Sequence, residues 1–187
     1  MNAAIEADWT VITLPSFFGP AVPAVQALGN TALLDGPLLG LLASRECPGA
    51  VLIETLEQVP GWVRTGQVIV SGFHSPLEQL VLRSLLRRQG KAVKILARGR
   101  PTHRIAGPER TALEAGRLLI LTACPQGVKR ITRASALARN RLVLALAREC
   151  VIPHAAPGSP LDELVSNPCA HADLGVERHP PTLIHHE

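Results

Sequence analysis

The chain has 187 residues, 47% of them hydrophobic and 18% charged, and a formal net charge of +4. This length and apolar fraction allow one domain with a substantial core and exclude an intrinsically disordered chain. Because no apolar run approaches the ~18–20 residues that span a bilayer, and because the N-terminal stretch lacks the basic start of a signal peptide, we expect a cytoplasmic protein without a membrane partner.

Short apolar runs alternate with amphipathic segments of helical length. The predicted strands are residues 38–44, 67–71, 92–97, 117–123 and 150–155. The predicted helices are residues 50–63 (ending near Pro60–Gly61), 76–89, 131–148 and 161–166, with a polar loop over residues 100–116. This alternation indicates βαβ units, and therefore predicts an α/β, Rossmann-like three-layer fold with a mainly parallel sheet. We place the domain at residues 29–166, between an N-terminal segment (1–28) and a flexible tail (167–187).

The turn after the second predicted strand carries a helix-start signature. Ser75 can cap the following helix, Pro76 suits its first position, and Glu78 completes an S-x-x-E capping box. Gly72 permits a tight turn directly after Ser71. Because helix N-termini at the carboxyl edge of a parallel sheet favour phosphate, we predict an anion site with free backbone N–H groups here. A simple packing turn is the alternative, and the Glu78 carboxylate would compete with an anion or accept a hydrogen bond from a ribose or base.

Small residues and arginines also follow the other predicted strands. Ser44 and Arg45 follow the first strand, Arg98 and Arg100 the third, and Gly158–Ser159 the fifth. The carboxyl ends of parallel strands share one edge of a sheet, so we expect these residues to converge on one crevice.

Charge is segregated along the chain. Sixteen of the nineteen Lys and Arg residues, but only two of the fifteen acids, lie between positions 79 and 148. This asymmetry indicates binding of phosphates, and of nucleic acid in particular, with solvated basic helix faces as the alternative. The chain has no Tyr and only 3% aromatic residues, and Phe73 is the one aromatic in a suitable position, so we expect electrostatic binding rather than base stacking.

The cysteines and histidines form no familiar metal-binding pattern. There is no C-x-x-C pair, and the spacing in the tail fits no zinc site. The residues concerned in the tail are Cys169, His171, His179, His185 and His186. We predict free thiols, no metal and no cofactor.

The order of these motifs resembles the DNA-processing protein A family (DprA, also called Smf), within the superfamily of Rossmann-like domains that includes the lysine-decarboxylase-like (LOG) nucleotide hydrolases. The resemblance covers residues 28–165. The motifs that carry it are Gly29–Asn30, Leu33–Leu34, Ala43–Ser44–Arg45, Ser71–Gly72, Arg98–Gly99, Arg139–Asn140–Arg141 and Gly158–Ser159. The chain looks like a minimal, divergent member: Ala43 replaces a glycine, His74–Ser75–Pro76 stands where the family carries Ala-Arg-Gly, and a winged-helix appendage is absent.

The resemblance implies that the protein binds single-stranded DNA in DNA uptake or recombination, and that it forms a homodimer and has a recombinase partner. Arginines would contact the phosphates, and the turn at Ser71–Gly72–Phe73 would supply backbone donors. The predicted phosphate-binding residues are Ser44, Arg45, Ser71, Gly72, Phe73, Arg98, Arg100, Arg139, Asn140, Arg141, Gly158 and Ser159.

Two other functions compete with this one. Related domains hydrolyse nucleoside monophosphates, and Pro157–Gly158–Ser159 with Asp162–Glu163 partly resembles their loop, so a nucleotide sensor or phosphoribohydrolase of the LOG type is the first alternative. Catalysis would need a placed carboxylate, for which Glu78 and Glu163 are the candidates, although a solvated helix turn also explains Asp162–Glu163. His74 is a further acid or base candidate.

A scaffold that acts through dimerisation is the second alternative. The residues favour a binding role over an enzymatic one.

Overall fold

A single eight-stranded sheet, in the order β1-β2-β6-β5-β4-β3-β7-β8, organises the molecule. The computed structural model describes residues 9–14, 25–101, 105, 107–166 and 182–185. The strands are β1 (Thr10–Ile12), β2 (Val25–Gly29), β3 (Leu38–Leu41), β4 (Val68–Ser71), β5 (Lys91–Leu96), β6 (Leu118–Thr122), β7 (Ala147–Ile152) and β8 (Thr182–His185). The helices are α1 (Gly49–Arg64), α2 (Pro76–Arg87), α3 (Gly107–Glu114), α4 (Arg133–Leu146) and α5 (Pro160–Ser166), with the 3-10 helix η2 (Thr31–Leu34).

The sheet is mainly parallel. Every pairing from β6 across to β8 is parallel, whereas β2 pairs antiparallel with both β6 and β1. This arrangement confirms the predicted Rossmann-like α/β fold.

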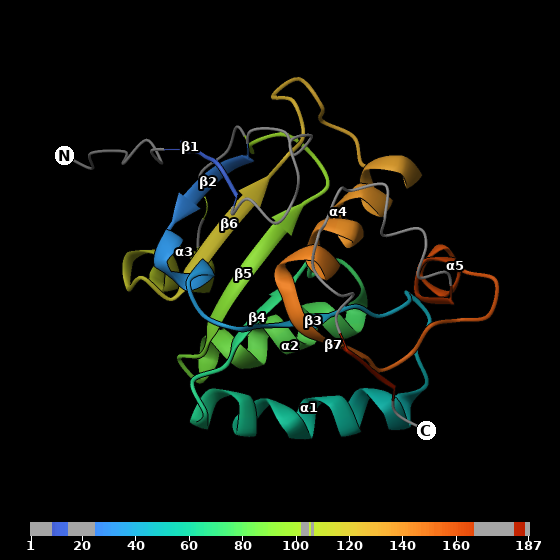
Figure 1. The fold of residues 1–187 in the computed structure, drawn as a ribbon. Helices are drawn as coiled ribbons and strands as arrows, with labels where there is room; N and C mark the ends of the chain where they lie inside the picture. Colours follow the sequence, from blue (N-terminus) through green and yellow to red (C-terminus); the bar gives the residue numbers. More distant parts are fainter. Residues whose placement is uncertain (1–8, 15–24, 102–104, 106, 167–181, 186–187) are drawn as a thin grey trace.

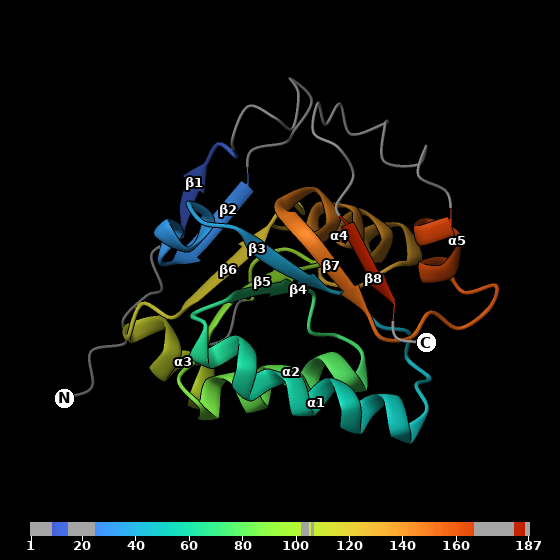
Figure 2. The same ribbon diagram turned by 60° about the horizontal axis from the view of Figure 1, so that its bottom comes forward.

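Helices cover both faces of the sheet, which gives three layers (Figures 1 and 2). Helices α1, α2 and α3 lie on one face, and α4 and α5 lie on the other. The central strands are therefore buried on both sides, and all five residues of β6 are buried. Burial on both faces is the reason that these strands read as continuous apolar runs instead of alternating ones.

Two helix predictions are wrong. Helix α1 does not end near Pro60–Gly61 but continues to Arg64, with the exposed Pro60 inside it. The buried Thr55 and Val59 anchor this helix on the core, and that packing tolerates the one backbone hydrogen bond that a proline removes.

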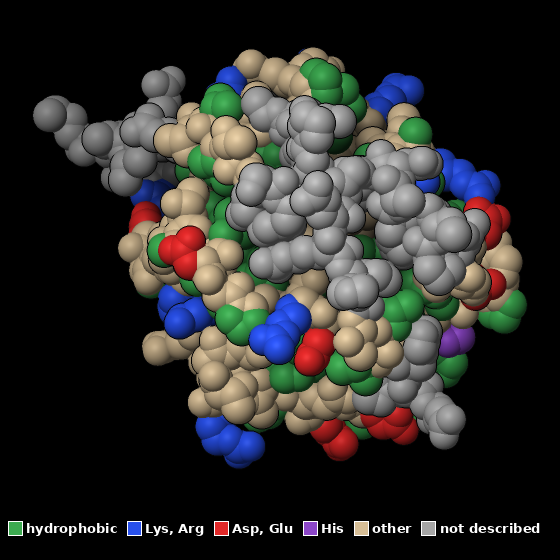
Figure 3. Space-filling model, in the orientation of Figure 1, with side chains coloured by type: hydrophobic (Ala, Val, Ile, Leu, Met, Phe, Trp, Pro, Cys, Tyr) green, Lys and Arg blue, Asp and Glu red, His purple; other side chains and the backbone are tan. Residues whose placement is uncertain are grey.

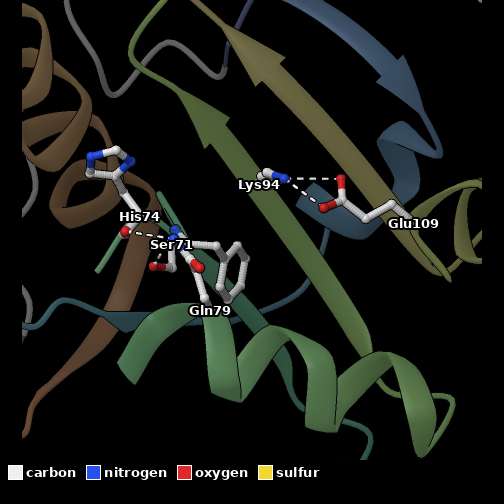
Figure 4. Close-up of polar contacts among 6 residues, drawn as sticks. Ser71, His74, Gln79, Lys94 and Glu109 are labelled. Atoms are coloured by element: carbon white, nitrogen blue, oxygen red, sulfur yellow. Dashed lines mark hydrogen bonds and ion pairs between the residues drawn. The ribbon is translucent and has the colours of Figure 1, made fainter. Parts of the chain in front are cut away.

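The predicted loop over residues 100–116 contains helix α3. Pro108 lies at its start, where a missing N–H costs little. Buried Ala112 packs against the core, and Lys94 Nζ of β5 contacts Glu109 Oε1 and Oε2 at 2.7 and 2.9 Å (Figure 4). This ion pair joins separate segments and stabilises a helix that its short local sequence does not predict.

The flanking segments also contribute strands. The expected boundary between residues 28 and 29 falls inside β2, and residues 182–185 of the expected tail form β8 beside β7. The other metal-ligand candidates of the tail, Cys169, His171, His179 and His186, lie outside the described residues. Among the helices that the structure describes, none is both long enough and apolar enough to cross a bilayer.

Candidate functional site

The carboxyl ends of β3 and β4 lie side by side and meet helix α4. Ser44 follows β3, Ser71 ends β4, and both strands are parallel neighbours. Helix α4 packs against these strands and brings Arg139 to the turn after β4. Three of the predicted phosphate-binding residues, Ser44, Ser71 and Arg139, therefore meet at one edge of the sheet.

Gly72 is required by the close approach of Arg139. A Cβ atom on Gly72 would lie 2.4 Å from Arg139 Nε and 2.6 Å from its Cζ. The positive φ of this turn occurs at Phe73 (47°), not at the glycine. The sequence reasoning that Gly72 serves the turn itself is therefore wrong: the glycine makes room for a guanidinium.

Phe73 and Ser71 serve the turn from within. The Phe73 N–H donates to Ser71 Oγ at 3.1 Å, and the Phe73 side chain is 4% exposed and packs into the core on the α1–α3 side. Its ring is therefore not presented for stacking on a base, and its N–H is already bonded.

Glu78 occupies the anion position at the start of α2. Its Oε2 accepts from the N–H groups of His74 (2.7 Å) and Ser75 (3.2 Å), and its Oε1 accepts from the Ala43 N–H (3.0 Å). Ser75 Oγ in turn accepts from the Glu78 N–H, which completes the predicted capping box. The expectation that this turn leaves its N–H groups free for a phosphate is wrong for His74 and Ser75. At 2% exposed and with both oxygens bonded to backbone donors, Glu78 is a structural cap instead of an available catalytic carboxylate.

His74 lies between two arginines. Its Nε2 is 3.2 Å from Arg45 Nη2, and its backbone carbonyl accepts from Gln79 Nε2 at 2.9 Å (Figure 4). Burial lowers the pKa of His74. The positive charges of Arg139 and Arg45 lower this pKa further, and the Glu78 carboxylate opposes the shift. The edge thus carries three basic side chains, Arg45, His74 and Arg139, which we call the basic cluster.

Arg139 is a buried cation. It is 8% exposed, and its Nε and Nη2 donate to Asn140 Oδ1 at 3.1 and 2.8 Å. Burial lowers its pKa, and the Glu78 carboxylate opposes that shift. The ion pairs found among the described residues join Lys94–Glu109, Arg110–Glu114 and Arg133–Glu163, and none includes the predicted site arginines.

The loop after β7 closes the other side of this edge. Ser44 Oγ accepts from the Ala156 N–H at 2.9 Å and lies 3.3 Å from Ser159 Oγ. The Gly158 N–H donates to Asp162 Oδ2 at 2.8 Å, so this backbone donor, like those of His74 and Ser75, is already bonded to a carboxylate of the following helix. The structure therefore places Ser159 beside Ser44, as predicted.

The remaining candidates lie farther from the basic cluster or point elsewhere. Arg98 and Arg100 follow β5, the neighbour of β4, and the Arg98 carbonyl accepts from Thr122 Oγ1 at 2.7 Å. Arg141 lies about 200° round the helix from Arg139, and its Nε is buried without a hydrogen-bond partner among the described residues. Glu163 is 63% exposed and pairs with Arg133 at 3.2 Å, as a surface residue does.

Sequence reasoning missed two exposed cations, Lys129 and Arg130, between β6 and α4. The Gly99 N–H donates to the Val128 carbonyl at 2.8 Å, so their loop lies against the turn that carries Arg98 and Arg100. Their place in the loop between the fourth predicted strand and the helix predicted from residue 131 was the available signal. Figure 3 shows Lys and Arg side chains in several separate groups on the described part of one face.

Within the described residues, no group of three or more His, Cys, Asp or Glu side chains is arranged to hold a metal ion. The guanidinium groups at this edge equip it for anion binding.

Comparison with known proteins identifies a family and two similar folds. The family model of DNA recombination-mediator protein A matches residues 19–159. No curated protein sequence matches the chain. The fold is similar to that of DNA processing protein A from Helicobacter pylori, for which a single-stranded DNA binding mode has been described (TM-score 0.71, 22% identity, covering 96% of this chain and 81% of that one). It is also similar to DNA processing protein A from Streptococcus pneumoniae (TM-score 0.71, 20% identity), where the match covers 97% of this chain and 63% of that one.

Proposed function

Because the chain belongs to the DNA recombination-mediator protein A family, we propose that it binds single-stranded DNA in DNA uptake or recombination, through phosphate contacts at the carboxyl edge of its sheet. The resemblance to the Helicobacter pylori protein, which binds single-stranded DNA, supports this ligand. The homodimer and the recombinase partner stay predictions.

The observation that carries the proposal is the environment of Arg139. Its guanidinium is 8% exposed, it rests against the Cα of Gly72, and the described residues provide no carboxylate within ion-pair distance. The Glu78 carboxylate acts on this guanidinium from beyond ion-pair distance, and its oxygens are bonded to backbone N–H groups. A phosphate oxygen would supply the direct charged partner that the described residues do not provide.

Other cations extend this edge in the direction of β5 and β6. Arg98 and Arg100 follow β5, the neighbour of β4. Lys129 and Arg130 stand on the adjoining loop. A row of cations spread over several strands suits a chain of phosphates better than one mononucleotide.

The carboxylates do not favour a nucleotide hydrolase. Glu78 is bonded to three backbone N–H groups, and Glu163 lies in an exposed ion pair with Arg133. Neither is placed as a general base at the basic cluster, so we prefer binding to catalysis.

Fluorescence anisotropy of a labelled single strand of about 30 nucleotides, at about 50 and 200 mM salt, tests the proposal. We expect salt-sensitive binding that Arg139→Ala weakens at least tenfold, with a salt slope reduced by about 0.7, the value for one phosphate contact on a single strand. Arg87→Ala is the matched control, since Arg87 is an exposed cation of the same basic block at the far end of α2, and it should bind within about twofold of the wild type.

Two further arms complete this experiment. Arg139→Lys keeps the charge but loses the planar guanidinium, and thermal unfolding of each variant separates misfolding from lost contact. A mononucleotide competitor distinguishes a polymer site from a nucleotide site. Absence of binding at low salt, or equal binding by Arg139→Ala and the wild type, would refute the proposal.

A further inference from the structure

We infer that His74 is a titratable phosphate ligand, so that binding of the nucleic-acid backbone at this edge is coupled to the uptake of one proton by its imidazole. This inference rests on the proposed function and names a residue of that site, together with its dependence on pH.

The contact between Arg45 and His74 defines the protonation state without a ligand. A guanidinium has only donors, so His74 Nε2, at 3.2 Å from Arg45 Nη2, has to accept the hydrogen bond. The ring is then neutral, and its proton sits on Nδ1. The imidazole projects from the turn, away from helix α2 (Figure 4).

The backbone of His74 is fixed on both sides. Its N–H donates to Glu78 Oε2 at 2.7 Å, and its carbonyl accepts from Gln79 Nε2 at 2.9 Å. The ring is thus attached to a rigid helix start, and only its side-chain torsions are free to turn Nε2 from Arg45 to an incoming oxygen.

Charged groups face the imidazole from three elements. Arg45 follows β3, Arg139 comes from α4, and Glu78 comes from α2. Arg139 and Arg45 each affect the imidazole more strongly than Glu78 does. Both oxygens of Glu78 are bonded to the N–H groups of Ala43, His74 and Ser75 and are not available to the ring. Together with burial the two arginines lower the pKa of His74, and the free site resists a third positive charge.

A phosphate held by Arg45 and Arg139 reverses this balance. Its negative charge favours the imidazolium, whose Nε2–H can then donate to a phosphate oxygen, while Arg45 turns from the ring to the phosphate. The proton comes from solvent, and no covalent bond changes in the nucleic acid. Affinity should therefore rise as the pH falls toward the ordinary histidine value.

Calorimetric titration of oligo-dT in two buffers of different ionisation enthalpy measures the proton directly. Near pH 7 we expect wild-type protein to take up a proton fraction that approaches one per site, and His74→Gln to take up none. Over about pH 6 to pH 8 the wild-type affinity should fall by more than tenfold, and that of His74→Gln by less than about twofold. His154→Gln is the matched control and should follow the wild type, because no hydrogen bond found among the described residues joins its side chain to the basic cluster.

His74→Arg gives a second readout, since a permanent cation should bind tightly at all of these pH values. Oligonucleotide binding with equal proton uptake by the wild type and His74→Gln would overturn this inference and leave the proposed function standing. Failure of the wild type to bind at any pH would overturn both.

Discussion

The Arg139 guanidinium lies directly against the Cα of Gly72, so closely that any side chain on the glycine would occupy its place. A Cβ atom at position 72 would approach Arg139 Nε to 2.4 Å and Cδ to 2.6 Å. A turn after β4 and a side chain of α4 are thereby made dependent on each other. The basic cluster exists because the residue after Ser71 has no side chain.

Gly72→Ala should therefore impair binding more than stability. The added methyl group displaces the flexible end of Arg139, so we expect a stability loss of about 1 kcal/mol and a loss of oligonucleotide affinity similar to that of Arg139→Ala. Denaturant unfolding and anisotropy measure the two effects. Gly127→Ala is the control, because a Cβ there meets nothing within 4 Å among the described residues outside its own chain neighbours. Unchanged affinity in Gly72→Ala would contradict the geometry of the site.

Glu78→Gln should lower the free energy of unfolding by about 2–3 kcal/mol, because one amide oxygen replaces a carboxylate that accepts from three backbone N–H groups. Urea unfolding with a constant m-value checks this expectation. Glu163→Gln, which alters only an exposed ion pair, should change stability by no more than about 0.5 kcal/mol. Equal stability of the two variants would show that Glu78 does not stabilise the start of α2.

Ser44→Ala should loosen the loop after β7. Without Ser44 Oγ the Ala156 N–H loses its acceptor, at a cost of about 1–2 kcal/mol. Hydrogen exchange should become faster at residues 156–159 and stay unchanged in β4. Ser166→Ala, at an exposed position in α5, is the matched substitution, and the same exchange pattern in both variants would rule out this role of Ser44.

The unliganded protein should become less stable as the pH falls, and part of this loss should come from His74. Because its pKa is lowered in the folded state, the unfolded chain binds the proton first. The stability contribution is complete above the ordinary value of 6.5 and is lost as the pH falls from there through the lower folded pKa. Unfolding curves at several pH values should show a smaller slope for His74→Gln below pH 6.5 than for the wild type. Parallel curves would exclude the effect.

Local patterns were enough for the parts of the fold that depend on neighbouring residues. The capping box of Ser75 and Glu78 lies within one helical turn, and the apolar runs of β4 and β6 reflect burial on both faces of a parallel sheet. Helix α3 was not predicted because it is short, starts with Gly-Pro and depends on the ion pair between Lys94 and Glu109. Strands β1 and β8 escaped because three or four residues at a sheet edge carry too little periodicity.

The sequence by itself determined the fold class and predicted which residues follow the strands at the carboxyl edge of the sheet, because strand and helix patterns and strand-end positions are local properties. Only the tertiary structure decided what those residues do there. The Ala43 N–H reaches Glu78 from 35 positions away, Arg139 comes to rest on Gly72, and Arg45 meets His74. Each contact joins separate strands and helices, so its distance depends on how the layers pack and not on any spacing along the chain.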